Sequence, residues 1–309
     1  MRHVDFLIAR AKIVRAIRAF FDARGFVEVE TAVRIPAPAP EEHIDCPPCR
    51  DGGYLRASPE LQMKKLLAAG MDRIYQIGPC FREGERGSRH SPEFTMIEWY
   101  RRAATYLDIR RDLEALMDTL TKEALSGACP QGLRGVCPPG GKAPESRTLS
   151  VREAYLTHAG WDPWAGWDQD RFDFDMATKI ELAIKELGGG VFLMDYPPQA
   201  ASLAKLTTAL PTTNNPRPTT YAERWEFYWD GMELANCFTE LCDRDEQKLR
   251  FEKAKEARKL LKEADYPIDS EFIDCLPKIE NAAGVALGVD RLVMVLTKMK
   301  EISAVRAQI

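Results

Sequence analysis

The sequence lacks both of the glycine-rich loops by which the common nucleotide-binding folds hold phosphate. It contains no G-x-x-x-x-G-K-[ST] motif and no G-x-G-x-x-G motif after a predicted strand. It also lacks the alternation of strands and helices that builds a parallel sheet. These absences exclude the P-loop and dinucleotide-binding classes, so any nucleotide site must be built from other elements.

A strong charge of either sign is also missing. Lysine and arginine number 43 against 47 aspartate and glutamate, which gives a net charge of −4, and no long cationic run is present. Extended contact with nucleic acid depends on such a cationic footprint, so we expect no extended contact with tRNA. ATP binding stays possible, because a few arginines inside a pocket outweigh the average charge.

Long apolar runs are absent as well. No stretch approaches the roughly 18 apolar residues of a membrane span, and the first residues do not form the apolar run of a signal peptide. We therefore expect a cytoplasmic protein without membrane contact, whose eight cysteines are reduced. Cys46 and Cys49 could hold half of a zinc site with Cys129 and Cys137, but the second spacing is poor, so buried or loop thiols are favoured.

The patterns that are present predict one α+β domain over residues 1–309, with an antiparallel β-sheet flanked by helices. Helical spacing of apolar residues is found over 5–24, 61–69, 108–125, 150–159, 176–187, 244–264 and 290–299. Strand patterns cover 26–30, 74–81, 94–100, 191–196, 225–234 with a continuation to 241, and 284–289. Loops are expected over 36–48, 127–144 and 207–220, which are rich in proline, glycine or turn residues. Neither a Gly/Ser linker nor an internal repeat marks a domain boundary.

Two arginines stand where a nucleotide could use them. Arg82 ends a predicted strand, and a charged loop over 82–91 leads back to Phe94 on the antiparallel partner strand. The Arg82 guanidinium can hold a phosphate through two hydrogen bonds, and Phe94 offers a flat face to a base. Arg291 follows Gly288 at a strand-to-helix junction, where a missing side chain admits a ligand. Taken alone, either arginine could equally form a surface ion pair.

Together the two segments resemble motifs 2 and 3 of the class II aminoacyl-tRNA synthetases. The matching stretches are FREGERGSRHSPEFT at 81–95 and GVALGVDRLVM at 284–294. The predicted helix over 5–24, followed by GFVEVET at 25–31, resembles motif 1, the dimer-interface element of that family. The resemblance covers nearly the whole chain. It implies the class II catalytic fold, a homodimer, and ATP- and Mg²⁺-dependent activation of an amino acid as its adenylate.

Two further stretches resemble the lysine-specific branch of that class, namely YAERWE at 221–226 and ELANCFTEL at 233–241. The N-terminal anticodon-binding barrel of that branch is not expected, because motif 1 begins near residue 10. A lysyl-tRNA synthetase-like core without it is typical of the elongation factor P lysine ligase family. Ala286 agrees, since lysyl-tRNA synthetases usually have glycine there, and its methyl group suits the β-isomer. The resemblance implies that lysine or (R)-β-lysine is attached to a lysine of elongation factor P.

The resemblance also assigns roles on the nucleotide side. Arg82 would hold the α-phosphate, and Arg291 would sandwich the adenine with Phe94, so that both arginines are catalytic. The other expected nucleotide contacts are Glu83, Gly84, His90, Ser91, Glu233, Leu234 and Gly288. Glu233 and Glu240 would bind Mg²⁺, which neutralises phosphate charge. Residues seven apart on a flat strand point to opposite faces, so a bulge or bend near 236–237 is expected, and a single glutamate ligand remains the alternative.

On the amino-acid side, carboxylates are expected because a desolvated cationic substrate needs them. The residues placed there by resemblance are Ser58, Pro59, Glu60 and Glu98 around the α-amino group, Tyr100 and Glu246 toward the side-chain ammonium, and Glu240 and Ala286 in the pocket wall. Less specific interpretations stay open, namely a helix cap for Ser58, a structural Tyr100 and a solvated Glu246.

Three positions depart from the family pattern. Gly84 stands in place of the motif 2 acid, so Glu83 or Glu85 is expected to substitute for it. Ala32 replaces a proline of motif 1, and Cys237 replaces a glycine. These departures put the geometry of the loop and pocket in question.

Two other functions are compatible with the same core. A truncated lysyl-tRNA synthetase would charge tRNA, whereas a synthetase-like module without catalysis would only bind ligands. The presence of Arg82, Glu233, Glu240 and Arg291 disfavours the binding module.

Overall fold

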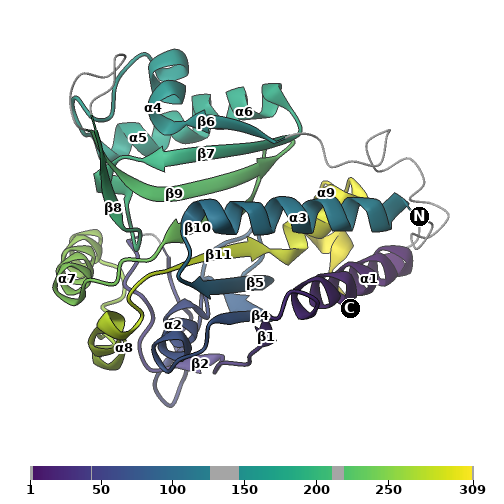
Figure 1. Cartoon of the computed structure of the whole chain (residues 1–309), viewed down its shortest axis with the longest axis horizontal. Coiled ribbons are helices and arrows are strands. Elements are labelled where there is room, and N and C mark those ends of the chain that lie inside the picture. The colour runs from purple at the N-terminus through teal and green to yellow at the C-terminus, as the bar shows by residue number, and fades with distance from the viewer. Residues whose placement is uncertain (1–2, 43, 126–145, 211–218, 308–309) are drawn as a thin grey trace.

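The computed structural model describes residues 3–42, 44–125, 146–210 and 219–307. Within them a nine-stranded sheet has the order β1-β4-β5-β11-β10-β9-β7-β6, with β8 paired to β9 (Figure 1). The strands are β1 (Val27–Glu28), β4 (Arg73–Phe81), β5 (Glu93–Arg102), β6 (Arg147–Ser150), β7 (Gly190–Tyr196), β8 (Leu206–Ala209), β9 (Thr219–Trp229), β10 (Met232–Thr239) and β11 (Ala282–Gly288). All pairs are antiparallel except β1–β4 and β6–β7. The predicted α+β class with an antiparallel sheet is confirmed.

Helices flank this sheet on its faces and at its ends (Figure 1). They are α1 (His3–Asp22), α2 (Glu60–Ala68), α3 (Tyr106–Leu125), α4 (Val151–Ala154), α5 (Gln169–Asp175), α6 (Glu181–Leu187), α7 (Arg244–Leu261), α8 (Ser270–Cys275) and α9 (Val289–Thr297). The predicted helices over 150–159 and 176–187 each include a π-helical turn, at Tyr155–Ala159 and Met176–Ile180. Among the described helices, none combines the length and apolar character required to cross a membrane.

The largest apolar core lies between the central strands and a layer made of α1, α3 and α9 (Figure 1). On β5, Ile97 and Trp99 are fully buried in this core. Successive strand residues point to opposite faces, so Met96, Glu98 and Tyr100 point away from the helices. The side chains of these three residues line a cavity instead. The burial of one face of β5 therefore fixes which residues the other face presents.

The register of β11 brings together segments that are far apart in the sequence. Ala286 of β11 lies opposite Glu98 of β5 and opposite Asn236 of β10. The β4–β5 hairpin, with Phe81 opposite Glu93, confirms the predicted hairpin. The two arginine segments predicted from sequence are thus parts of one sheet surface.

Three sequence predictions differ from the structure. The strand predicted to run from 225 to 241 is two strands, β9 and β10, joined at Asp230 and Gly231, whose φ angles are 48° and 73°. An Asp-Gly pair is a common signal for such a hairpin turn, and it was hidden by apolar residues on both sides. The predicted half-buried strand over 26–30 pairs only as β1, and Val27 is 51% exposed. The loop predicted over 207–220 contains most of β8 and begins β9. Residues 211–218 and the loop predicted over 127–144, with Cys129 and Cys137, lie outside the described residues.

Gly231→Ala should destabilise the fold more than a matched glycine substitution. A Cβ at Gly231 would lie 2.5 Å from Cβ of Lys185, and the backbone is left-handed there. Gly160→Ala is the control, because Gly160 has a similar φ of +74° but nothing within 4 Å of the new Cβ. Urea unfolding should give a loss of about 1–2 kcal/mol for the control from backbone strain. The clash should add about 1–3 kcal/mol in Gly231→Ala. Equal losses would contradict the described turn.

Candidate active site

A cavity of ≈ 360 Å³ opens on the face of β5, β10 and β11 that carries Glu98. Its wall also includes the β4–β5 loop, the first turn of α9 and the segment around Glu41. Most of the residues predicted to form the site meet here: Ser58, Glu60, Arg82, His90, Ser91, Phe94, Glu98, Tyr100, Glu233, Leu234, Ala286, Gly288 and Arg291. Residues from four separate stretches of the sequence therefore converge on one cavity.

One end of the cavity is cationic. The guanidinium carbon of Arg82 lies 5.2 Å from the ring centroid of Phe94, and Nε of Arg82 is buried without a hydrogen-bond partner among the described residues. Arg291 donates to the backbone oxygen of Glu233 at 3.0 Å and lies 2.7 Å from Nε2 of His90. An unsatisfied buried donor is costly, and a phosphate oxygen would satisfy that of Arg82. This end suits an anion that carries an aromatic ring.

Glu233 is the acidic residue of the cationic end. Its carboxylate is 3.2 Å from Nη1 of Arg291. Burial raises the pKa of Glu233, and repulsion from Glu226 raises it further, while Arg291 and Arg82 lower it. Mg²⁺ is commonly held by one or two carboxylates together with substrate phosphates, so the donor chemistry of Glu233 fits that ion.

The assignment of Glu240 as a second Mg²⁺ ligand stays a prediction, and its surroundings differ from those of Glu233. The expected bulge lies between Glu233 and Ala235 instead of near residues 236–237, and Glu240 follows the end of β10. Its side chain is 0% exposed and forms an ion pair with Lys64. Glu233 pairs with Arg291 instead, so the two glutamates contact different cations.

The other end of the cavity is acidic. The Ser58 hydroxyl donates to Oε1 of Glu98 at 2.5 Å, and the Tyr100 hydroxyl donates to Oε2 at 2.7 Å. Ser58 also accepts a hydrogen bond from the backbone N–H of Glu60 at 3.0 Å, as a helix cap would. The same residue lines the cavity wall. Burial raises the pKa of Glu98 to about 7, with a further contribution from repulsion by Glu60.

Lys64 is a buried cation that the sequence analysis missed. Its ammonium group donates to Oε1 of Glu60 at 2.6 Å and pairs with Glu240. Burial alone would lower the pKa of Lys64, but the two carboxylates raise it, so Lys64 stays charged. Three carboxylates, those of Glu60, Glu98 and Glu240, thus share one cation, and the surplus of negative charge favours a ligand with ammonium groups. The Glu-x-x-x-Lys spacing on the predicted helix was the available signal.

Gly284 permits the close packing of this acidic end. A Cβ at Gly284 would lie 2.1 Å from the Tyr100 ring and 3.0 Å from Oε1 of Glu240. Only a residue without a side chain allows the ring to lie against β11. The neighbouring Ala286 contributes its methyl group to the cavity wall.

Besides Glu240, four predicted residues do not line the cavity. Pro59 precedes α2 as its N-cap, and Glu83 donates its backbone N–H to Asp45 O at 2.8 Å. Gly84 has a φ of +79° in the loop after β4. Glu246 pairs with Arg250, one turn later on α7, and its predicted contact with the substrate stays a prediction.

Other cavity residues had received no role from the sequence, among them Glu41, Arg224, Glu226, Asn236 and Phe238. Arg224 and Glu226 form an ion pair at 2.7 Å on β9. Cys46 and Cys49 are free thiols, and the described residues contain no group of three or more His, Cys, Asp or Glu side chains that could hold a metal ion.

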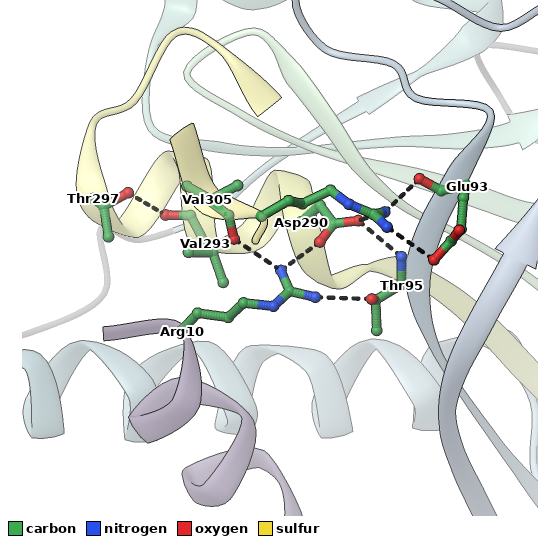
Figure 2. Close-up of polar contacts among 8 residues, drawn as sticks. Arg10, Glu93, Thr95, Asp290, Val293, Thr297 and Val305 are labelled. Atoms are coloured by element: carbon green, nitrogen blue, oxygen red, sulfur yellow. Dashed lines mark hydrogen bonds and ion pairs between the residues drawn. The ribbon is translucent and has the colours of Figure 1, made fainter. Parts of the chain in front are cut away.

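An ion-pair network around Asp290 adjoins Phe94 and Arg291 in the sequence (Figure 2). Asp290 is 2% exposed and pairs with both Arg10 of α1 and Arg306, the latter at 3.2 Å. It also accepts the backbone N–H of Thr95 at 2.8 Å. Because Thr95 follows Phe94 and Asp290 precedes Arg291, one carboxylate positions both groups that face the expected ring.

Comparison with known sequences shows the family of the chain. The sequence model of the family "tRNA synthetases class II (D, K and N)" matches residues 2–307. A protein of Proteus mirabilis named "Elongation factor P--(R)-beta-lysine ligase" is 35% identical over 97% of this chain and 94% of its own length. Proteins with the same name from Photobacterium profundum and Yersinia enterocolitica are each 34% identical, over 96% and 97% of this chain and 93% and 94% of their own lengths.

Asp290→Asn should lower both stability and nucleotide affinity. Removal of the negative charge leaves Arg10 and Arg306 without their shared partner, so urea unfolding should show a loss of about 2–4 kcal/mol. Glu93→Gln is the matched control, because Glu93 pairs with the same Arg306 at 3.1 Å but its side chain is 57% exposed. The control should lose less than about 1 kcal/mol. Titration with a fluorescent ATP analogue measures the affinity, and equal effects of the two variants would contradict the role of Asp290.

The affinity for lysine, the substrate that the sequence predicts, should rise with pH through the pKa of Glu98, about 7. Burial favours the protonated carboxyl in the empty cavity, whereas an ammonium group favours the carboxylate. Below this pKa, binding must release a proton, so the association constant should rise by up to about tenfold per pH unit and then level off. Calorimetry in buffers of different ionisation enthalpy counts the released protons. Burial also raises the pKa of Glu240, to about 8, so Glu98→Gln should bind more weakly and release fewer protons without abolishing the release. An unmodified protein that releases none would refute the assignment.

Proposed function

The chain belongs to the class II tRNA synthetase family (D, K and N), and from that premise we propose that it is an ATP-dependent ligase for a protein acceptor. It activates lysine or (R)-β-lysine and joins it to a lysine side chain of elongation factor P. The acidic end of the cavity supports a diammonium substrate. There Glu60 and Glu240 pair with Lys64, and the Glu98 carboxylate accepts from Ser58, so carboxylates outnumber this cation. Elongation factor P as the acceptor is supported by the names of relatives, which align with this chain over nearly their full length.

The first half-reaction needs no nucleophilic side chain. The carboxylate of the amino acid attacks the α-phosphorus of ATP, and pyrophosphate leaves. Arg82, whose Nε is buried without a partner among the described residues, would hold the α-phosphate, and Arg291 with Phe94 would bind the adenine. Fixed cations of this kind lower the barrier because they are already oriented toward the developing charge.

Glu233 would be the protein ligand of Mg²⁺, with phosphate oxygens completing the coordination. The ion supplies charge neutralisation at the phosphates. Arg291 pairs with Glu233 at 3.2 Å and keeps its carboxylate at the nucleotide end.

The amino acid would lie between the two ends. One ammonium group would pair with the carboxylates of Glu60 and Glu98, and the other would lie near Glu240 and Tyr100. The carboxylate of the amino acid would face Arg82. Ala286, opposite Glu98 on the neighbouring strand, limits the depth of the pocket and supports the choice of the β-isomer.

We also propose that the chain forms a single catalytic domain that acts as a homodimer in the cytoplasm. Val4 and Ile8 of α1 are 55% and 46% exposed, and Val27 of β1 is 51% exposed, in the segments that resemble the dimer-interface motif. Burial of such apolar side chains between subunits is favourable. The cytoplasmic location is supported by the acceptor, which acts in translation.

The acceptor is tested by offering two acceptors to the same activated amino acid. Purified protein is incubated with ATP and labelled lysine or β-lysine, together with elongation factor P and total tRNA. We expect label on elongation factor P, and label on tRNA alone would favour the truncated tRNA-charging enzyme instead. Lysine-dependent pyrophosphate exchange measures the activation step separately, and its absence would favour a binding module.

Arg291→Ala should reduce pyrophosphate exchange by about 10²–10³-fold, because it removes a fixed positive charge at the nucleotide. Arg111→Ala is the control, since Arg111 on α3 has a side chain that is 74% exposed and makes only a local ion pair with Asp108. The control should keep full activity. An active Arg291→Ala variant would refute the nucleotide assignment.

A further inference from the structure

Glu41 is a carboxylate in the cavity wall to which the sequence analysis gave no role. It comes from the proline-rich segment over 36–48 and lines both the main cavity and a small adjoining hollow of ≈ 20 Å³. The described residues provide no hydrogen bond or ion pair to its side chain. Each of the other carboxylates in the cavity wall has a partner: Glu60 with Lys64, Glu85 with Arg82, Glu98 with Ser58, Glu226 with Arg224, Glu233 with Arg291 and Asp290 with Arg306.

The backbone that carries Glu41 is held in place although it has no regular secondary structure. Arg258 of α7, which is 1% exposed, donates to the backbone oxygen of Glu41 at 2.7 Å and to that of Ile44 at 3.2 Å. Its other terminal nitrogen donates to the Asp45 carboxylate at 2.5 Å. The backbone N–H of Glu83 then donates to Asp45 O at 2.8 Å. The segment is thereby fixed to the residue next to Arg82.

The charged groups that act on Glu41 come from both ends of the cavity. Burial raises the pKa of Glu41, and Glu60 on α2 raises it further, while Arg82 after β4, Arg224 on β9 and Lys64 on α2 lower it. Glu41 also lies close enough to the Cys46 thiol to raise the pKa of that thiol, although burial is the larger cause. Glu41 thus lines the cavity within electrostatic reach of Arg82 at its cationic end and of Glu60 and Lys64 at its acidic end.

The charges of the acidic end leave Glu41 without a role in the first half-reaction. Glu60, Glu98 and Glu240 with Lys64 carry two net negative charges when ionised, which match the two ammonium groups of lysine. Glu41 adds one more negative charge. The second half-reaction brings one more ammonium group, that of the acceptor lysine, which must lose a proton before it can attack.

We propose that Glu41 binds the ammonium group of the acceptor lysine and takes its proton, so that the neutral amine attacks the adenylate. This inference rests on the proposed function. The amine nitrogen forms a bond to the carbonyl carbon, and the bond between that carbon and the phosphate oxygen breaks, with its electron pair going to AMP. The nitrogen loses its second proton to the departing phosphate as the amide forms. Glu41 is therefore a general base for transfer and is not needed for activation.

Glu41→Gln separates the two half-reactions. Lysine-dependent pyrophosphate exchange should stay within about threefold of the unmodified protein, which also shows that the variant folds. Transfer of lysine to elongation factor P near neutral pH should fall at least about tenfold, because a general base contributes roughly 10²–10⁴-fold. The defect should shrink as the pH approaches the pKa of a free lysine, about 10.4, because the acceptor amine then loses its proton to solvent. Glu41→Asp, which keeps the carboxylate, should retain part of the transfer activity.

Two controls make the test specific. Glu42→Gln removes the same charge from the adjacent residue, which does not line the cavity, and should leave both half-reactions unchanged. Hydroxylamine is neutral near neutral pH, so it should accept lysine equally well from the unmodified protein and from Glu41→Gln.

Three results would overturn the inference: unchanged transfer to elongation factor P by Glu41→Gln, an equal loss of exchange and transfer, or an equal loss with hydroxylamine and with elongation factor P. Failure of the proposed function has a different signature, because the unmodified protein would then show no lysine-dependent exchange. That result would overturn both proposals together.

Discussion

The carboxylate of Asp290 connects four parts of the chain on which the nucleotide end depends. It binds Arg10 from α1, the backbone of Thr95 on β5 and Arg306 near the C-terminus, while itself belonging to α9. Burial of a carboxylate is costly unless it is fully paired, and two arginines with one backbone N–H provide that pairing. Phe94 and Arg291 are the immediate neighbours of Thr95 and Asp290. In the proposed function both residues face the adenine, so the Asp290 carboxylate fixes the backbone beside each of them.

The cavity in front of this network separates opposite charges along its length. Arg82 and Arg291 lie at the end proposed for the nucleotide, and Glu60, Glu98 and Glu240 with Lys64 lie at or behind the other end. The separation follows from the sheet, because β5 presents Glu98 and Tyr100 on the face opposite its apolar core. Charges that are already in place need no reorganisation during the reaction, which is the main source of catalysis in an enzyme that positions its substrates.

Local sequence patterns predicted much of this architecture. The β4–β5 hairpin and the junction of β11 with α9 were predicted from apolar spacing and from glycine or charged turns, and both exist. The break between β9 and β10 was missed, because one Asp-Gly pair stands within a long aromatic and apolar stretch. Resemblance placed Glu246 at the substrate, whereas its carboxylate pairs with Arg250, one turn later on α7.

The groups that sequence reasoning missed are those whose partners are distant in the chain. Glu41 is positioned by Arg258, a residue of α7, and nothing in the proline-rich segment itself indicates that it reaches the cavity. Lys64 could be paired with Glu60 from helix spacing, but its contact with Glu240 depends on the packing of α2 against the end of β10. Such contacts are decided by tertiary structure, which a single sequence does not display.

The central claim is that the acidic end of the cavity selects a diammonium amino acid for activation. The most direct test is ATP–pyrophosphate exchange with a panel of amino acids, which should include aspartate and asparagine because the family also uses these substrates. We expect exchange with lysine or β-lysine and none with aspartate, asparagine or the neutral amino acids of similar size. Exchange that aspartate or asparagine supports as well as lysine does would contradict the central claim.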